Sequence, residues 1–329
     1  MANMNDVARL AKVSRGTVSN YINGVRIKDE PAKRIEKAIE ELNYVPNQAA
    51  RALKKQTSDT IAFILPTIWT PFFAELTHHI QLELQRHNLK MLLCNSQNDF
   101  NLELDYVKMA KEEKVRGIIT ISYSDIDPYV TSNLPLVSIE RYFNQHVPFV
   151  TSDNFQGGQL AVKSLHERGA TKLLMILREL PNNLGIHERM NGFIDYCKHL
   201  SIDYDVYLDK GDSKGFSKRV EEYLVSCYKE ECSFDGIFTA TDRYAEYVID
   251  AFRTLKWQIP EDVQLIGFDG ARSYETEQLR ISTIAQDIKK IAEISVEEML
   301  NFNIERSSQK KNILPVKLLD LQTTKKLNE

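Results

Sequence analysis

Charged and aromatic side chains recur directly after short apolar runs in the second part of the chain. Glu140 and Arg141 follow the run 136–139, and Asp269 follows the run 265–268. If these runs are parallel strands of an α/β sheet, ligands bind just beyond their carboxyl ends. A carboxylate accepts hydrogen bonds from neighbouring hydroxyls and a guanidinium donates two in parallel, so these residues fit a polyhydroxylated ligand. The candidates at such run ends are Trp69, Thr70, Phe73, Ser122, Tyr123, Glu140, Arg141, Asp242 and Asp269.

A structural role is the alternative for each of these residues. A strand-end Asp often caps the helix that follows it, and Arg141 could pair with Asp153 instead of a ligand. The run ends therefore indicate where a site would lie, and they leave open which side chains touch the ligand.

The elements that would position these residues alternate along the chain. Six apolar runs are typical of buried parallel strands: 61–65, 91–94, 117–121, 173–177, 236–239 and 265–268. Between and after them lie amphipathic helical segments, at 72–86, 102–113, 156–167, 189–200, 216–228, 244–255 and 288–300. This alternation predicts an α/β fold with doubly wound parallel sheets, one sheet before about Asp153 and one after it.

Three helical patterns separated by short breaks occupy the segment from Asn5 to Asn43. Ser14 suits the N-cap of a second helix over 15–23, and Gly24 suits the left-handed position that follows a helix. The third pattern begins near Asp29 and carries an apolar stripe at helical spacing: Ile35, Ala38, Ile39 and Leu42. The segment predicts a small three-helix core.

The exposed side of the second helix carries mainly short polar groups: Arg15, Gly16, Thr17, Ser19 and Asn20. Such groups reach base edges in the DNA major groove, and a short helix after a tight turn has helix-turn-helix geometry. The charge distribution also favours DNA binding by this segment. Residues 1–57 hold eleven Lys and Arg against six Asp and Glu, whereas the rest of the chain holds 31 Lys and Arg against 40 Asp and Glu. A three-helix protein-binding module is the alternative, but it does not require this polar turn.

Motifs in this segment closely resemble the LacI/GalR family of bacterial repressors. They are Val7-Ala8-Arg9-Leu10-Ala11-Lys12-Val13-Ser14-Arg15-Gly16-Thr17-Val18-Ser19, then Ile22-Asn23-Gly24, then Leu42-Asn43-Tyr44-Val45-Pro46-Asn47. The resemblance extends over nearly the whole chain and implies a homodimer that reads a near-palindromic operator. Arg15, Gly16 and Asn20 match the family's base-reading positions, with Asn20 standing where Arg is common. The expected DNA-contacting residues are Asn5, Ser14, Arg15, Gly16, Thr17, Ser19, Asn20, Asn23, Asn47, Ala50, Leu53 and Lys54.

The segment from Asn47 to Gln56 is rich in helix formers but too short to be stable alone, since isolated helices below about 12 residues are marginal. It resembles the family's hinge helix, in which the residue matching Leu53 wedges between base pairs of the minor groove. Such a wedge kinks DNA, and the neighbouring Arg51 and Lys54 suit phosphates. A flexible linker is the alternative.

The same resemblance implies a body like a periplasmic binding protein, with two lobes and a ligand cleft between them. Arg189 matches an Arg of the family's effector pocket. Other positions at or beside effector contacts are Thr70, Phe73, Ser122, Glu140, Thr241, Asp242 and Asp269. Glu140 stands where Asp is frequent, which alters the expected pocket. The effector that these residues imply is a sugar or a sugar phosphate.

The expected domain boundaries follow from these segments. Residues 1–57 form the helix-turn-helix DNA-binding domain, which includes the hinge helix at about 47–56. Residues 58–329 form the effector-binding and dimerisation domain. Its first lobe takes in about 60–152 plus 287–312, and its second lobe about 153–286 plus 313–329.

Length and composition agree with a multi-domain globular protein of 329 residues, 43% of them hydrophobic and 27% charged. No apolar run approaches the roughly 18 residues that span a membrane. Residues 1–9 are too polar for a signal peptide, so we expect a cytoplasmic protein. The four cysteines lack zinc-ligand spacing, and neither a metal nor a cofactor is expected.

These observations predict a sequence-specific DNA-binding regulator, a repressor of carbohydrate-utilisation genes whose operator affinity is changed by a small sugar-like effector. An enzyme is not expected, because no nucleophile elbow, phosphate-binding loop or dinucleotide fingerprint follows a strand. A transport binding protein would lack the helix-turn-helix. Two alternatives within the family stay open: a catabolite-control-type regulator with a phosphoprotein corepressor, and a purine-type repressor that requires a corepressor. Whether the effector induces or corepresses also stays open.

Overall fold

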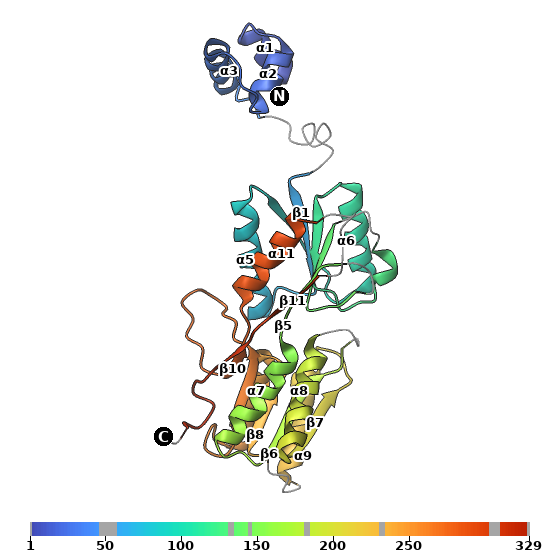
Figure 1. Cartoon of the computed structure of the whole chain (residues 1–329), viewed down its shortest axis with the longest axis vertical. Helices are drawn as coiled ribbons and strands as arrows, with labels where there is room; N and C mark the ends of the chain where they lie inside the picture. Colours follow the sequence, from blue (N-terminus) through green and yellow to red (C-terminus); the bar gives the residue numbers. More distant parts are fainter. Residues whose placement is uncertain are drawn as a thin grey trace. The chain divides into compact units, whose positions relative to one another are not determined.

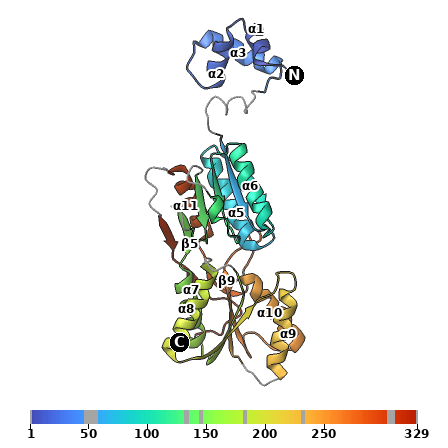
Figure 2. The ribbon, with the colours of Figure 1, turned by 90° about the vertical axis from the view of Figure 1, so that its right-hand side faces the viewer.

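The computed structural model describes residues 2–45, 58–130, 135–143, 147–180, 185–229, 234–302 and 310–327. The chain divides into two compact units, Met1–Ser58 and Asp59–Glu329. Figures 1 and 2 show the elements of each unit from two directions.

The N-terminal unit contains three short helices packed together: α1 (Met4–Leu10), α2 (Arg15–Ile22) and α3 (Asp29–Glu41) (Figure 1). The Oγ of Ser14 accepts a hydrogen bond from the backbone N–H of Thr17, and Gly24 has a φ of 72°. The predicted N-cap and the predicted left-handed glycine are therefore confirmed. Side chains from all three helices meet in one small core: Val7, Ala8, Ala11, Val18, Ile35, Ala38 and Tyr44.

The second unit contains two six-stranded sheets, as the alternating pattern predicts. The first sheet has the strand order β11-β5-β4-β3-β1-β2, and its pairs are parallel. Its strands are β1 (Thr60–Leu65), β2 (Lys90–Asn95), β3 (Gly117–Thr120), β4 (Leu136–Ile139), β5 (Phe149–Ser152) and β11 (Lys311–Leu314). The second sheet has the order β12-β10-β9-β8-β6-β7 and is parallel except for β12, which runs antiparallel to β10. Its strands are β6 (Lys172–Arg178), β7 (Asp203–Asp209), β8 (Gly236–Thr239), β9 (Gln264–Asp269), β10 (Ser282–Ala285) and β12 (Lys317–Leu319).

Helices cover both faces of each sheet. In the first lobe, α5 (Pro71–Arg86) and α11 (Ile288–Leu300) lie side by side on one face, and α6 (Phe100–Glu112) lies on the other (Figure 1). A short helix, η1 (Asp127–Tyr129), precedes β4. In the second lobe, α7 (Asn154–Glu167) and α8 (Gly185–Leu200) cover one face, and α9 (Phe216–Lys229) and α10 (Asp242–Leu255) cover the other (Figure 2).

Strand alternation explains how one run of apolar residues serves two cores. In β1, Phe63 packs into the cluster with α5 and α11, whereas Ala62 and Ile64 pack into the cluster on the α6 face. Successive side chains of a strand point to opposite faces, so a strand covered on both faces is apolar throughout. This is the physical reason why these strands are unbroken hydrophobic runs.

The chain passes between the two lobes three times, after β5, after β10 and after β11. Ile291 and Val296 of α11 belong to the first lobe's core although α11 follows β10 of the second lobe. These crossings bring the carboxyl ends of strands from both sheets to the boundary between the lobes.

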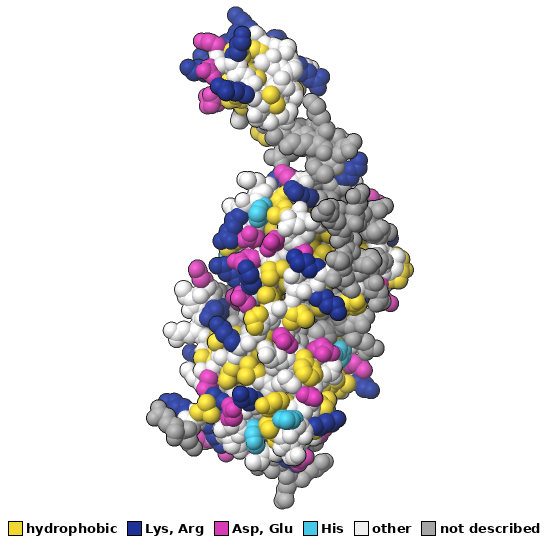
Figure 3. Space-filling model, viewed as in Figure 1, with side chains coloured by type: hydrophobic (Ala, Val, Ile, Leu, Met, Phe, Trp, Pro, Cys, Tyr) yellow, Lys and Arg dark blue, Asp and Glu magenta, His cyan; other side chains and the backbone are white. Residues whose placement is uncertain are grey.

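The surface carries charges of both signs. On the face that Figure 3 shows, Lys and Arg side chains are interspersed with Asp and Glu over the second unit. Three cysteines, Cys94, Cys197 and Cys227, are buried. No helix among the described segments is long and apolar enough to cross a membrane.

Candidate functional site

The outer face of α2 matches the chemistry expected of it. Arg15, Gly16 and Asn20 are exposed, as is Asn5 at the start of the unit. Val18, on the opposite side, is fully buried. A Cβ built on Gly16 would meet only the Oγ of Ser14, at an ordinary 3.6 Å, so the unit's own packing does not require glycine there.

The other predicted DNA-contacting residues of this unit make local hydrogen bonds. The hydroxyls of Ser14 and Thr17 lie 2.9 Å apart, and the Nδ2 of Asn23 donates to the backbone carbonyl of Ser19 at 2.7 Å. These bonds hold the two ends of α2, which leaves the exposed residues between them oriented by the helix. Asn47, Ala50, Leu53 and Lys54 lie outside the described residues.

A cavity of about 510 Å³ lies where the two lobes meet. Seven of the predicted effector residues line it: Trp69, Thr70, Phe73, Glu140, Arg189, Thr241 and Asp269. The first lobe contributes the residues after β1 and β4, and the second contributes those of α8 and those after β8 and at the end of β9. The strand ends thus bring together Trp69 and Asp269, which are 200 positions apart in the sequence.

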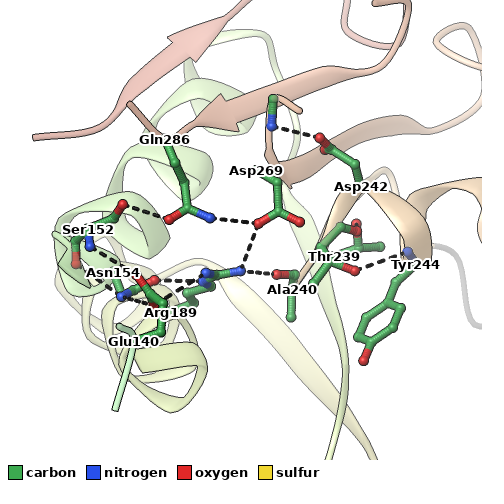
Figure 4. Close-up of polar contacts among 12 residues, drawn as sticks. Glu140, Ser152, Asn154, Arg189, Thr239, Ala240, Asp242, Tyr244, Asp269 and Gln286 are labelled. Carbon is green, nitrogen blue, oxygen red and sulfur yellow. Dashed lines mark hydrogen bonds and ion pairs between the residues drawn. The ribbon is translucent and has the colours of Figure 1, made fainter. Parts of the chain in front are cut away.

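Arg189 forms the polar centre of the cavity wall and is only 4% exposed (Figure 4). Its Nε donates to the Oδ1 of Asn154 at 2.7 Å, and its Nη1 donates to the carbonyl of Ala240 at 2.5 Å. The guanidinium carbon lies 3.5 Å from the ring centroid of Phe268. A buried side chain held on three sides has one orientation, so this cation is fixed before any ligand arrives.

Two carboxylates flank this guanidinium. Nη1 lies 3.6 Å from the Oδ1 of Asp269, and Nη2 lies 3.8 Å from the Oε2 of Glu140. Glu140 also accepts hydrogen bonds from the Oγ1 of Thr151 and the Nδ2 of Asn154, both at 3.0 Å. The arrangement presents a guanidinium and two carboxyl groups on one wall, which is donor and acceptor together.

Both flanking carboxylates stand on unusual backbone. Glu140 has a φ of 59° and Asp269 a φ of 124°, values that cost a non-glycine residue about 1–3 kcal/mol. Each residue comes directly at or after the end of a strand, where the chain turns away from the sheet. The strain aims the side chain at the lobe boundary, which favours a functional role for both positions.

Asp269 and Asp242 lie close together in the second lobe. Burial raises the pKa of Asp269 to about 7, although Arg189 and the Nε2 of Gln286, which donates at 2.8 Å, oppose the shift. Burial, together with the charge of Asp269, also raises the pKa of Asp242 well above its usual value. The two carboxyl groups therefore carry fewer than two negative charges at neutral pH.

Three predicted effector residues do not line the cavity. Arg141 donates to the Oγ of Ser122 and to the Oδ1 of Asp127, each at 2.9 Å, and so is held inside the first lobe. Its partner is Asp127, not Asp153. Asp242 accepts from the backbone N–H of Gly270 at 2.7 Å. These three side chains support the loops of the site and do not face the cavity.

Other residues of the cavity wall were missing from the predicted set. They are Arg178, Lys214, Phe216, Arg243, Tyr244 and Tyr247, whereas Tyr123 after β3, a candidate from its run end, does line the cavity. Arg178 is the last residue of β6. The strand-end rule applied to β6 would have found it, whereas the aromatic residues of α9 and α10 carried no separate sequence signal.

The Oγ1 of Thr70 is buried, and it has no hydrogen-bond partner among the described residues. Thr70 also precedes the first turn of α5 without capping it through its side chain. Buried hydroxyls are nearly always paired, so an unpaired one on a cavity wall indicates a place for a ligand or a water molecule.

Comparisons with known proteins agree with this architecture. Residues 3–47 match the family described as bacterial regulatory proteins, lacI family, and residues 162–324 match the periplasmic binding protein-like domain. A sucrose operon repressor of Streptococcus mutans is 32% identical over 321 residues, which cover 97% of this chain and 98% of that protein. The chain belongs to the lacI family of bacterial regulatory proteins.

Two further relatives extend the lacI-family match. A ribose operon repressor of Halalkalibacterium halodurans is 29% identical over 338 residues, covering 99% of this chain and 98% of that protein. The crystal structure of a periplasmic binding protein/LacI transcriptional regulator from Alkaliphilus metalliredigens, complexed with D-xylulofuranose, is 27% identical with a TM-score of 0.72. The match covers 82% of this chain and 100% of that relative. This lacI-family chain is therefore similar to named transcriptional repressors along its full length.

Proposed function

We propose that this lacI-family chain is an operator-binding repressor of carbohydrate-utilisation genes whose affinity for DNA is set by a sugar-like effector in the cavity. One observation carries the proposal: the fixed guanidinium of Arg189 stands between the carboxylates of Glu140 and Asp269 on a cavity wall. Vicinal hydroxyls both donate and accept, and a paired cation and anion satisfy both roles.

Aromatic rings complete the proposed sugar site. Phe73 and Tyr123 from the first lobe and Phe216 and Tyr244 from the second line the same cavity. The C–H faces of a sugar ring pack on aromatic faces, while its hydroxyls reach the polar wall. Named relatives of this chain repress sucrose and ribose operons, and a structural relative holds D-xylulofuranose, which supports the same ligand class.

The DNA side of the proposal rests on α2. Its exposed Arg15, Gly16 and Asn20 would reach base edges, and Ser14, Thr17, Ser19 and Asn23 would order the helix and reach phosphates. We propose a homodimer, because two copies of α2 related by a two-fold axis read a near-palindromic operator. Asn47, Ala50, Leu53 and Lys54 enter this proposal on the sequence resemblance alone.

Coupling between the two functions follows from the cavity's position. Its wall takes residues from both lobes, so a bound effector contacts both and prefers one arrangement of the lobes over another. Moving an equilibrium from 99:1 to 1:99 needs about 10⁴-fold preference, or roughly 5.5 kcal/mol. An effector that bridges Arg189 and Glu140 can supply such a preference, because its contacts form only when both lobes are in place.

The test combines thermal unfolding of the full chain with DNA binding. A panel of sugars, sugar phosphates and purines is screened for a rise in melting temperature, since a ligand of the native state stabilises by about 2.7 kcal/mol at a hundredfold excess over Kd. Each stabilising compound is then added to the chain bound to an operator selected from random duplexes. Release of the operator marks an inducer, and tighter binding marks a corepressor.

Two outcomes would redirect the proposal. A purine that stabilises the chain where no sugar does would favour the purine-type alternative. A panel with no stabilising compound, together with capture of a phosphorylated protein that tightens operator binding, would favour the catabolite-control alternative. Both outcomes contradict a sugar effector and leave the DNA-binding function standing.

A further inference from the structure

We propose that the cavity has a second, anion-binding end and that the effector is a phosphorylated sugar. The inference rests on the proposed function, because it names the class of sugar that the same cavity would hold. It depends on where charged residues stand along the edge of the second sheet.

The strand order of the second sheet separates two kinds of charge. Along the order β10-β9-β8-β6-β7, Gln286 follows β10 and Asp269 ends β9, beside Arg189. Basic residues occupy the other end, where Arg243 follows β8 and Arg178 ends β6. The segment after β7 adds Lys214.

The three strands that Arg178 ends, or that Lys214 and Arg243 follow, are direct neighbours. β8 pairs with β6 and β6 pairs with β7, so their carboxyl ends lie about 5 Å apart along the edge. Arg178, Lys214 and Arg243 all line the same cavity as Arg189 and Asp269. The cavity therefore runs from a mixed polar end to a basic end.

Arg178 and Lys214 are not held in close ion pairs, although Lys214 lies near enough to Asp212 to lower the pKa of that carboxyl group. Arg178 is half-buried and within hydrogen-bonding reach of the Tyr244 hydroxyl, and Lys214 is exposed. Neither forms an ion pair with any carboxylate in the described part of the chain. The nearest acids of the β7 segment are already used, because Arg219 binds Asp209 at 2.7 Å and Asp212 at 3.5 Å.

Arg243 is less available than the other two. Its guanidinium is paired with Glu246 and lies 5.0 Å from the ring centroid of Tyr247. The pair is about half exposed, and such surface pairs are worth at most about 1 kcal/mol. A dianion at Arg178 and Lys214 would draw Arg243 without breaking a buried contact.

The charge of the whole wall favours an anion. Among the described lining residues, four are cations and two are carboxylates: Arg178, Arg189, Lys214 and Arg243 against Glu140 and Asp269. The pKa of Asp269 is raised to about 7, which reduces the negative charge further. A neutral sugar would leave the half-buried Arg178 without a counterion at the cavity wall, whereas an anion would supply one.

A phosphate monoester fits the basic end better than a single carboxylate. It carries a charge of about −1.5 to −2 at pH 7 and three strong acceptor oxygens, and guanidinium groups bind phosphates through two parallel hydrogen bonds. Three separate cations, one at the end of β6 and two on the segments that follow β7 and β8, match three oxygens. The rings of Phe216 and Tyr244, 4.7 Å apart, are packed edge to face in the same wall and suit the apolar face of the sugar.

The experiment measures binding of matched pairs to the full chain by thermal unfolding and calorimetry. Each of several sugars is compared with its own phosphate ester, with inorganic phosphate and with a sugar acid. We expect one ester to bind at least tenfold more tightly than its parent sugar. The affinity for that ester should fall as ionic strength rises. We also expect inorganic phosphate to compete weakly for the site.

The double variant Arg178→Gln/Lys214→Gln tests whether the basic end causes the higher affinity for the ester. The ester's advantage over its parent sugar should fall at least tenfold in this variant. Lys218→Gln/Arg253→Gln is the matched control, because it removes one Lys and one Arg from exposed pairs on α9 and α10 outside the cavity. Lys214→Gln alone serves if the double variant does not fold, since Lys214 is exposed.

The failure of this inference is distinguishable from failure of the proposed function. A parent sugar that binds as tightly as its ester, and releases the operator, would overturn the basic end while the repressor function stands. A sugar acid that equals the ester, or an ester that binds no better than inorganic phosphate, would likewise overturn a phosphorylated sugar. Loss of the ester's advantage in the control variant would show a general charge effect and contradict the assignment.

Discussion

The Nη2 of Arg189, on α8 of the second lobe, lies 3.8 Å from the Oε2 of Glu140, which follows β4 of the first lobe. The two side chains thus connect the lobes across the wall of the cavity. A ligand that contacts both will be sensitive to the distance between them, and this makes the pair the natural place to test effector binding and stability together.

Arg189→Ala should remove both properties. The variant leaves Glu140 and Asp269 without their cation in a buried setting, and breaking a buried ion pair costs about 3 kcal/mol. Urea unfolding measures the loss, and operator binding with and without effector measures the response. Arg189→Lys keeps the charge but not the fork, so it should recover part of the stability and little of the effector affinity. Full effector response in either variant would contradict the role of Arg189.

The raised pKa of Asp269 makes stability depend on pH. The folded chain holds this proton up to about pH 7, whereas the unfolded chain releases it near 3.8. The contribution of Asp269 to the free energy of unfolding should therefore fall as pH rises from about 4 to about 7, and stay constant above that. Asp269→Asn should reduce this slope. An equal slope in urea unfolding of both proteins would place the titration elsewhere.

Gly16→Ala should separate folding from DNA recognition. The new methyl group meets only the Ser14 hydroxyl at 3.6 Å, and alanine is a better helix former, so the free energy of unfolding should rise by about 0.5 kcal/mol. Affinity for the selected operator should fall at least tenfold, because the methyl group occupies space next to the bases. Gly24→Ala is the contrast: at a φ of 72° it should destabilise the unit. Unchanged operator affinity in Gly16→Ala would argue against a base contact at this face.

Leu53→Ala tests the proposed hinge. We expect it to weaken operator binding far more than binding to random DNA, since an intercalating side chain acts only where the duplex is kinked. Lys54→Ala should instead weaken both and reduce the salt dependence of binding, as the loss of a phosphate contact does. Equal losses on both DNAs for Leu53→Ala would refute the wedge.

Arg141→Met tests the structure's reassignment of this residue. Its guanidinium bonds to Ser122 and Asp127 within the first lobe and does not line the cavity. The variant should lower the free energy of unfolding by about 3 kcal/mol and leave effector affinity within about twofold at temperatures where it is folded. A selective loss of effector binding, without loss of stability, would restore Arg141 to the site.

Local chemistry explains which sequence predictions were secure. The N-cap at Ser14 and the glycine at position 24 depend on the backbone of a few neighbouring residues, and the structure confirms both. The strands of the body are equally local, because a strand covered on both faces must be apolar at every position. These elements, in their order, determined the fold class and the place of the cavity at the strand ends.

The sequence by itself therefore determined the elements, their alternation and the edge of the sheets at which a ligand would lie. Only the tertiary structure decided which strand-end residues share the cavity. It turned Arg141 inward to Asp127, added Arg178 and Tyr244 to the wall, and placed Glu140 opposite Arg189. The physical reason is that strand order and lobe crossing bring distant residues together, and a side chain's partners depend on those long-range neighbours.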